Sequence, residues 1–186
     1  MRLTGGEGKG RRLADPPDGV RPTSGRVKDS LFNRIASRLP GARVLDLYAG
    51  SGALGIEAVA RGADSVVFIE NDRRSQQVIR ENLKRCGFQN RGELIAGDVM
   101  KLLQHPDRLM GRFDLVFADP PYTDSDFSTV MGLLRQGNCL SPNGLVVFEG
   151  SSRSALPAPE GWILQQRHEI GDTALYFLEP EDSPTT

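Results

Sequence analysis

Between residues 44 and 148, short apolar segments alternate with segments of helical periodicity, and no other feature of the chain constrains its fold as strongly. Apolar strands are predicted at residues 44–47, 65–69, 94–96, 113–118 and 145–148. Amphipathic helices are predicted at residues 54–61, 73–85, 99–103 and 127–135. Continuous apolar strands that alternate with helices are typical of a parallel sheet covered by helices on both faces. The sequence therefore predicts an α/β fold.

The two ends of the chain depart from this alternation. Residues 162–170 and 174–178 flank a Gly-Asp turn, which predicts an antiparallel hairpin that completes a mostly parallel, seven-stranded sheet. A helix is predicted from Thr23 or Ser24 to Leu39. We divide the chain into a basic N-terminal arm or hairpin outside the main core at 1–22, a domain at 23–179 and a tail at 180–186.

Length and composition exclude several classes of protein. A chain of 186 residues with 38% apolar content can bury one substantial core. The longest apolar runs have four or five residues, far fewer than the roughly 20 that a membrane span needs. The first residues also lack the apolar core of a signal peptide. Cys86 and Cys139 lack metal-ligand spacing. We therefore expect a cytoplasmic monomer with two free thiols, no membrane contact and no metal.

The net charge of −1 conceals an uneven distribution of charge along the chain. Residues 1–43 carry ten Lys and Arg against four Asp and Glu, whereas residues 113–186 carry three against eleven. A basic N-terminal quarter on an acidic body suggests a localised anionic partner such as nucleic acid. A solvated polar face explains the same bias, so charge alone leaves both interpretations open.

A glycine-rich turn follows the first predicted strand. Gly50, Gly52 and Gly55 match the pattern G-x-G-x-x-G, which lets the backbone approach a ligand beside a helix N-terminus. Glu70 follows the second strand, 18 residues after Gly52, where a carboxylate can accept hydrogen bonds from both ribose hydroxyls. The pattern therefore predicts a nucleotide-type cofactor, but it does not separate NAD from S-adenosylmethionine.

Two further carboxylates favour S-adenosylmethionine. Asp46 precedes the turn, where a negative charge would repel a pyrophosphate but suits a cofactor with ammonium and sulfonium groups. Asp98 follows the third strand, where it could accept from an adenine amino group or, equally well, cap the helix that begins at Val99. The residues expected at the cofactor are Asp46, Tyr48, Gly50, Gly52, Glu70, Asn71, Asp98 and Val99.

The fourth strand ends in Asp119-Pro120-Pro121-Tyr122, which indicates the reaction. Two prolines fix the loop and remove two backbone donors, so that carbonyl oxygens are left as acceptors. The Asp119 carboxylate and the Pro120 carbonyl can then both accept from an exocyclic amino group, hold it in line with a methyl donor and stabilise its developing positive charge. Tyr122 offers a face on which an unpaired base can stack. These four residues are the predicted catalytic loop.

In the glycine-rich turn, the carboxylates after the strands and the predicted catalytic loop, the chain resembles class I S-adenosylmethionine-dependent methyltransferases that act on exocyclic amines. More narrowly, it is similar over nearly its whole length to the bacterial family that makes N2-methylguanine in 16S ribosomal RNA, at the position conventionally called guanine 966. Residues 9–12 (Lys-Gly-Arg-Arg) and the segment from Arg21 to Asn33 narrow the resemblance to that family. The chain departs from the pattern at Gly25, where an acidic residue is expected, and at Glu7 within the basic arm.

The resemblance implies S-adenosylmethionine as methyl donor, with S-adenosylhomocysteine as product. From the residues themselves we expect direct in-line methyl transfer, without a covalent enzyme intermediate and without a metal. It implies 16S ribosomal RNA as the partner, within the small subunit or an assembly intermediate. The arm and the segment after it would face the RNA, and seven basic side chains could contact phosphates. These are Arg2, Lys9, Arg11, Arg12, Arg21, Arg26 and Lys28.

Three other functions remain open on the sequence. The same loop could methylate adenine N6 in DNA or RNA, although 186 residues leave no room for a separate target-recognition domain. A nicotinamide-dependent oxidoreductase would use Gly50, Gly52 and Gly55 but would leave the catalytic loop without a role. A module that binds the cofactor without catalysis would also leave Asp119 unexplained.

Overall fold

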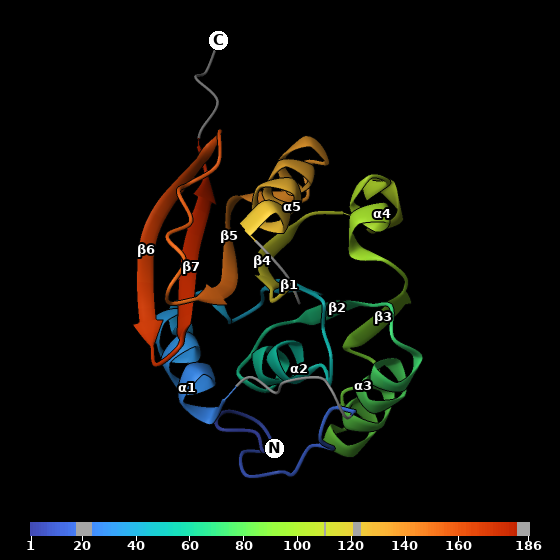
Figure 1. Ribbon diagram of the computed structural model, residues 1–186. Coiled ribbons are helices and arrows are strands. Elements are labelled where there is room, and N and C mark those ends of the chain that lie inside the picture. The colour runs from blue at the N-terminus through green and yellow to red at the C-terminus, as the bar shows by residue number, and fades with distance from the viewer. Residues whose placement is uncertain (18–23, 110, 121–123, 182–186) are drawn as a thin grey trace.

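A computed structural model describes residues 1–17, 24–109, 111–120 and 124–181 (Figure 1). Its strands are β1 (Arg43–Leu47), β2 (Ser65–Glu70), β3 (Gly92–Ala96), β4 (Phe113–Ala118), β5 (Leu140–Ser151), β6 (Trp162–Ile170) and β7 (Thr173–Pro180). Its helices are α1 (Gly25–Arg34), α2 (Ala53–Ala60), α3 (Arg73–Cys86), α4 (Val99–Leu103) and α5 (Asp124–Gln136), with 3-10 turns at Ala36–Arg38 and Pro106–Leu109. The predicted alternation of strands and helices is confirmed.

The strands form one seven-stranded sheet in the order β3-β2-β1-β4-β5-β7-β6. Strands β1 to β5 are parallel to one another, and β7 pairs antiparallel with both β5 and β6. The strand order reverses between β1 and β4, and ligands of such sheets bind at that point, outside the carboxyl ends of the strands. The predicted α/β class, with its C-terminal antiparallel hairpin, is confirmed.

Helices cover both faces of the sheet. Figure 1 shows α1, α2 and α3 on one face and α4 and α5 on the other. Each layer has its own apolar core, because the central strands bury side chains on both faces. The first core includes Phe32 and Phe117, whose rings meet edge to face, and the second includes the similar pair Phe127 and Phe148. Trp162 packs in the second core, and its indole nitrogen donates to a backbone carbonyl.

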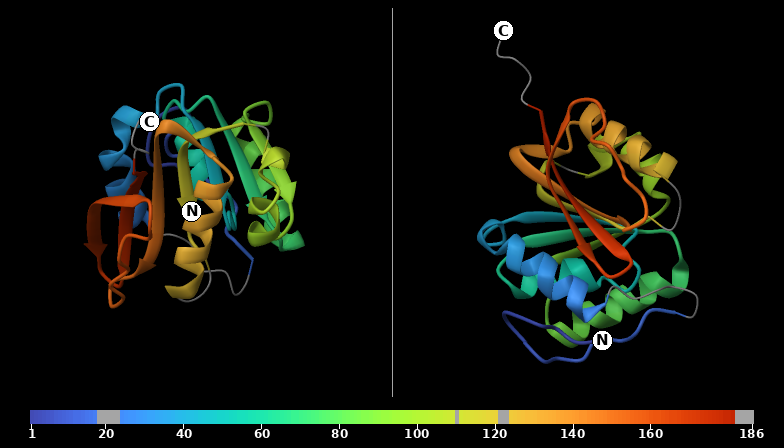
Figure 2. Two further views of the ribbon diagram at one scale, coloured as in Figure 1. Left: turned by 90° about the horizontal axis from the view of Figure 1, so that it is seen from above. Right: turned by 60° about the vertical axis from the view of Figure 1, so that its left-hand side comes forward.

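The N-terminal arm is a hairpin that packs against the protein. Arg2 and Arg12 form an antiparallel bridge, and the backbone N–H of Leu3 donates to the Arg11 carbonyl. Leu3 and Leu13 are fully buried in the core that α1, α2 and α3 share. The expectation of an arm outside the main core is therefore wrong for these two side chains. Figure 2 shows the hairpin as an outer layer against these helices.

Helix α1 is shorter than predicted. Ser24 caps it, its side chain accepting from the Val27 N–H, and α1 ends at Arg34 before a separate 3-10 turn. The apolar positions used for the prediction recur every four residues, and this spacing drifts by about 40° per repeat around an α-helix. The tighter turn brings Leu39 back to the core, where it is buried.

The bounds of several other elements also differ from the prediction, and β3 and α5 begin two and three residues before their predicted starts. β5 begins five residues before the predicted start of its strand and ends three residues after the predicted end. β7 extends to Pro180, so this residue belongs to the sheet and not to a tail.

Candidate active site

The carboxyl ends of four parallel strands bring the predicted site residues to one edge of the sheet. Leu47 of β1 is level with Ile69 of β2 and with Ala118 of β4, and Glu70 is level with Ala96 of β3. The glycine-rich turn, Glu70, the loop after β3 and the catalytic loop all follow directly. The side chains predicted from separate segments therefore share one edge, at the point where the strand order reverses.

The glycine-rich turn has a backbone that only small residues adopt readily. Gly50 and Gly52 have φ angles of 55° and 74°, in the left-handed region. Tyr48 has a φ of 57°, which is strained for a residue with a large side chain. Such strain is concentrated in ligand-binding loops, which agrees with a binding role for this turn.

Gly55 lets helix α2 approach the sheet closely. A Cβ atom at this position would lie 2.5 Å from the Phe68 ring and 2.6 Å from Val66, both in the strand beneath. It would also lie 3.0 Å from the Asp46 carboxylate. The third glycine of the pattern is therefore required by packing between helix and strand, as the glycine pattern implies.

We expect Gly55→Ala to destabilise the protein by about 1–3 kcal/mol, because a methyl group there overpacks a rigid strand surface. Gly132→Ala is the matched control, since α5 leaves open space at Gly132 and alanine is the better helix former. Urea unfolding should show a loss of stability for the first variant and an equal or higher stability for the second. Equal stability of Gly55→Ala and the unsubstituted protein would contradict this account of the close approach.

Glu70 joins the glycine-rich turn to the start of α3. Its side chain is buried, and its two carboxylate oxygens accept from the N–H groups of Gly50 at 2.7 Å and Asp72 at 2.9 Å. A carboxylate oxygen has more than one acceptor site, so each can still accept a hydroxyl. The geometry therefore fits a ribose between the turn and the end of β2.

Asp46 lies at the centre of the site. It is 3% exposed, and one carboxylate oxygen accepts from the Gly55 N–H at 2.9 Å, which ties the end of β1 to the start of α2. Burial, with a smaller contribution from the nearby charges of Asp119 and Glu70, raises the pKa of Asp46 to about 8, against the lowering effect of the Gly55 hydrogen bond. Three carboxyl groups from three strand ends therefore interact at this edge.

This pKa predicts a stability that depends on pH. The unfolded chain loses the Asp46 proton near pH 4, whereas the folded protein keeps it until about pH 8. Because the unfolded state then binds fewer protons, the contribution of Asp46 to the unfolding free energy falls as pH rises through this interval. Urea unfolding should show that Asp46→Asn removes this part of the pH dependence. An unchanged difference in stability between pH 5 and pH 8 would contradict a protonated Asp46.

The loop after β3 has two predicted roles, to cap helix α4 and to contact the cofactor. Asp98 is exposed and caps α4, its carboxylate accepting from the Lys101 N–H at 3.0 Å. Val99 is buried beside it, and Asn71 is exposed after β2. The capping role of Asp98 is confirmed, and a contact of these residues with a cofactor stays a prediction.

The structure describes part of the predicted catalytic loop. Asp119 and Pro120 are half-buried directly after β4, and the Asp119 charge acts on Asp46. Pro121 and Tyr122 lie outside the residues that the structure describes. The position of the first two residues agrees with the predicted role of the loop.

The basic residues predicted to face RNA divide into two groups. Arg2, Lys9, Arg11, Arg12 and Arg26 are exposed, whereas Arg21 lies outside the described residues. Lys28 is 1% exposed, and its ammonium donates to Glu57 at 3.0 Å and to the Arg2 carbonyl at 2.9 Å. The prediction that Lys28 contacts phosphate is therefore wrong, because its charge is neutralised inside the protein.

Glu57 holds the N-terminal hairpin to the helices. Its fully buried carboxylate accepts from Lys28, Arg61, the Thr4 hydroxyl and the N–H groups of Thr4 and Gly5. Burial alone would raise the pKa of Glu57, but the hydrogen bond from Arg61 and the charge of Lys28 outweigh it and hold that pKa below its usual value. The sequence carried a signal for this role, since Glu57 is the one charged residue of α2.

Asn82 of α3 connects the hairpin to the glycine-rich turn, a role that sequence reasoning missed. It is fully buried; its side-chain oxygen accepts from the Ala14 N–H at 2.7 Å and its nitrogen donates to the Ser51 carbonyl at 3.0 Å. Nothing local in the sequence distinguishes this asparagine from a surface residue. The hairpin and the glycine-rich turn are therefore linked through the side chain of Asn82.

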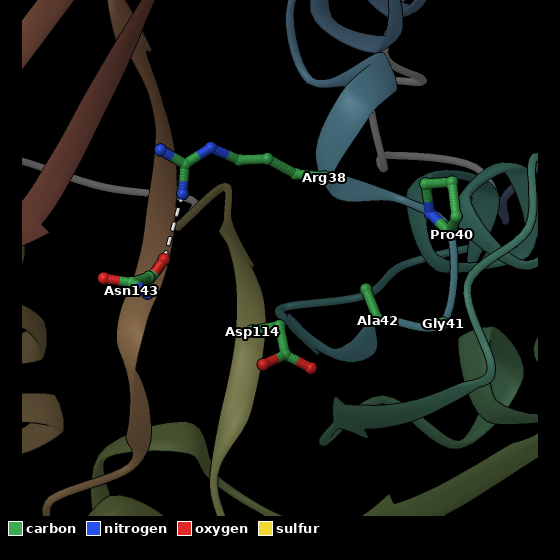
Figure 3. A pocket seen from close by; sticks show the side chains of 6 residues that line it. All are labelled: Arg38, Pro40, Gly41, Ala42, Asp114 and Asn143. Atoms are coloured by element: carbon green, nitrogen blue, oxygen red, sulfur yellow. Dashed lines mark hydrogen bonds between the residues drawn. The ribbon is translucent and has the colours of Figure 1, made fainter.

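A pocket of about 370 Å³ lies at the opposite edge of the sheet, where β1 and β4 begin (Figure 3). Arg38 crosses it and donates to the Asn143 carbonyl at 2.9 Å, and Asp114 accepts from the Arg43 N–H at 2.8 Å. These polar groups form hydrogen bonds within the protein, so the pocket gives no indication of a ligand. The described residues contain no group of three or more His, Cys, Asp and Glu suited to a metal ion, and none of their helices could span a membrane.

The sheet order, the antiparallel β7 and the glycine-rich turn after β1 define the class I fold of S-adenosylmethionine-dependent methyltransferases. The chain belongs to the family described as Conserved hypothetical protein 95, whose model matches residues 1–179. This membership, together with the relatives described next, confirms the family resemblance.

Known relatives cover nearly the whole chain. The protein named Ribosomal RNA small subunit methyltransferase D of Haemophilus influenzae is 34% identical over 92% of this chain and 89% of its own length. The protein of the same name from Escherichia coli is 32% identical over 97% of this chain and 90% of its own length. Among solved structures, the yhhF protein of Escherichia coli is 30% identical, with a TM-score of 0.86 over 98% of this chain and 99% of that one.

Proposed function

We propose that this protein methylates the exocyclic N2 amine of a guanine in 16S ribosomal RNA, at the position of the guanine 966 type, with S-adenosylmethionine as methyl donor. The observation that carries the proposal is the meeting of the glycine-rich turn, Glu70 and Asp119-Pro120 at one edge of the sheet. The relatives named Ribosomal RNA small subunit methyltransferase D support RNA of the small subunit as substrate.

The residues at this edge fit S-adenosylmethionine. Gly50 and Gly52 leave the backbone open to close approach by the cofactor, and Glu70 would accept from its ribose hydroxyls. Asp46 lies in a buried position where a cationic cofactor would favour the ionised carboxylate, so cofactor binding would release a proton near pH 7. When bound, the cofactor supplies an electrophilic methyl group.

Asp119 and Pro120 would orient the amine that accepts this methyl group. The nitrogen lone pair of guanine N2 is conjugated with the ring and is a poor nucleophile. Hydrogen bonds from the amine to the Asp119 carboxylate and the Pro120 carbonyl would direct the lone pair at the methyl group and stabilise the positive charge that develops on nitrogen. The transfer would be direct and in line, without a covalent intermediate on the enzyme: the N–CH3 bond would form as the S–CH3 bond breaks, S-adenosylhomocysteine would leave, and the methylated nitrogen would lose one proton.

The hairpin would supply part of the RNA contact. Arg2, Lys9, Arg11 and Arg12 are exposed on it, and Arg26 is exposed in the first turn of α1. Cations in such positions neutralise phosphates without reading sequence. Recognition of the target guanine would then depend on the folded shape of the RNA, within the small subunit or an assembly intermediate.

The proposal is tested by supplying methyl-labelled S-adenosylmethionine with one of three acceptors. These are unmethylated small ribosomal subunits, naked 16S ribosomal RNA and duplex DNA. We expect label in one or both RNA forms and none in DNA. Label in DNA alone, or no label despite tight cofactor binding, would refute RNA methylation.

A further inference from the structure

Helix α3 presents a strongly cationic face to solvent, on the layer that also carries the N-terminal hairpin (Figure 1). Its exposed side chains include five cations and one carboxylate, that of Glu81. The cations are Arg73, Arg74, Arg80, Lys84 and Arg85. This face includes none of the basic residues predicted from the sequence to contact RNA.

Three of these cations form a straight line along the helix. Arg73, Gln77, Arg80 and Lys84 are spaced by four, three and four residues, so their side chains lie above one another on a single stripe. At 1.5 Å per residue the stripe is about 16 Å long. We call the cations Arg73, Arg80 and Lys84 the α3 ridge.

The stability of the helix does not account for the ridge. Arg73 lies in the first turn of α3, which contains no acidic residue and where the helix dipole disfavours a cation by about 0.3–1 kcal/mol. Arg80 and Lys84 are like charges at i and i+4, a spacing that also destabilises a helix. Lys84, in the last turn, is the one ridge cation that the dipole favours.

The ridge also lacks internal neutralisation. Glu81 pairs with Arg85, at the side of the stripe. Within the described residues, no carboxylate forms an ion pair with Arg73, Arg80 or Lys84. Three exposed and unneutralised cations in a row fit a polyanion with regularly spaced charges.

The ridge joins the candidate active site to the hairpin. At one end, the Asp72 N–H donates to Glu70, so Arg73 lies three residues from the candidate ribose-binding carboxylate. At the other end, the Arg11 guanidinium donates to the Cys86 carbonyl at 2.7 Å. Asn82 fixes α3 to the hairpin between these two ends. The hairpin is therefore attached to α3 by polar contacts at two points, Asn82 and Cys86.

We propose that the α3 ridge binds the phosphate backbone of the RNA substrate and forms, with the hairpin, one continuous RNA-binding surface. This inference rests on the proposed function, and it adds helix α3 to the surface that would contact the RNA. Phosphate is the chemical group recognised, because arginine and lysine in an exposed line offer charge and donors without a pocket for a base.

The test compares two double variants that remove equal charge. Arg73→Gln with Arg80→Gln neutralises part of the ridge, and Arg108→Gln with Arg112→Gln neutralises two exposed arginines away from α3. Binding of each protein to an unmodified transcript of 16S ribosomal RNA and to assembled small subunits is measured over a range of salt concentrations, together with thermal unfolding and cofactor affinity.

We expect the ridge variant to bind the transcript on the order of tenfold more weakly at physiological salt. Its slope of log affinity against log salt should be shallower by roughly 1.5, about 0.7–0.9 for each lost phosphate contact. Its melting temperature should be unchanged or higher, because Arg73→Gln removes a cation from the first turn. The control variant should keep the slope of the unsubstituted protein.

Two results would overturn the inference. Equal slopes for the two variants would remove α3 from the RNA footprint, while methyl transfer to RNA by the unsubstituted protein would still support the proposed function. Weaker binding of the ridge variant to assembled small subunits, with unchanged binding to the naked transcript, would assign the ridge to a ribosomal protein. If the unsubstituted protein neither bound nor methylated RNA, the proposed function itself would fail.

Discussion

Asp119→Ala is expected to reduce methyl transfer by at least about 100-fold while cofactor affinity stays within a few-fold of the unsubstituted value. The physical reason is that the Asp119 carboxylate would accept from the target amine and stabilise the charge that develops on it during transfer. Asp119 lies at the end of β4, and the predicted ribose contact belongs to Glu70 at the end of β2. Single-turnover transfer to 16S ribosomal RNA and titration with cofactor measure the two quantities separately.

Two further variants test whether the charge and the position of the Asp119 carboxylate are responsible for the effect. Asp119→Asn keeps an acceptor oxygen but loses the charge, so its rate should lie between those of the alanine variant and the unsubstituted protein. Asp107→Ala removes an exposed carboxylate from the 3-10 turn at Pro106–Leu109 and should leave the rate unchanged. If Asp119→Ala lost cofactor binding and transfer to the same extent, Asp119 would be a cofactor contact and not a group that orients the amine.

Glu57→Ala is expected to lower the free energy of unfolding by about 3–5 kcal/mol, because it leaves the buried Lys28 ammonium without a counter-charge. It also removes the acceptor for the Thr4 and Gly5 N–H groups, so the hairpin loses its main polar contact with α2. The melting temperature should fall on the order of 10 °C. Urea unfolding and thermal unfolding give both values.

A matched control separates burial from charge. Glu81→Ala removes an exposed glutamate that pairs with Arg85 on α3, and such exposed i, i+4 pairs contribute about 0.3–0.5 kcal/mol. Both variants change the net charge by the same amount, so general electrostatics would affect them equally. If Glu57→Ala and Glu81→Ala had the same free energy of unfolding, Glu57 would not hold the hairpin to α2 as the structure indicates.

The sequence predicted the sheet and its site well because both depend on local patterns. Continuous apolar runs marked each parallel strand, and the glycine spacing marked the turn whose backbone the structure finds in the left-handed region. The strand ends then placed Glu70 and Asp119 at one edge without further information, since parallel strands share the direction of their carboxyl ends.

The errors arose where contacts between distant segments decide the outcome. In the local sequence Lys28 resembles the exposed basic residues, but Glu57, 29 positions away, pairs with it inside the protein. Leu3 and Leu13 were assigned to a detached arm, although the hairpin brings both into the core. The predicted helix to Leu39 ended early because a strict four-residue repeat cannot stay on one face of an α-helix. No local pattern reports such pairings.

Identification of the methylated nucleoside tests whether guanine N2 is the site of methylation. After transfer from methyl-labelled S-adenosylmethionine to unmethylated small subunits and to naked 16S ribosomal RNA, the RNA is digested and its labelled nucleosides are separated and identified by mass. We expect N2-methylguanosine as the labelled product, and we expect none of it with Asp119→Ala. Label in N6-methyladenosine would still agree with methylation of an exocyclic amine, but it would contradict guanine as the target.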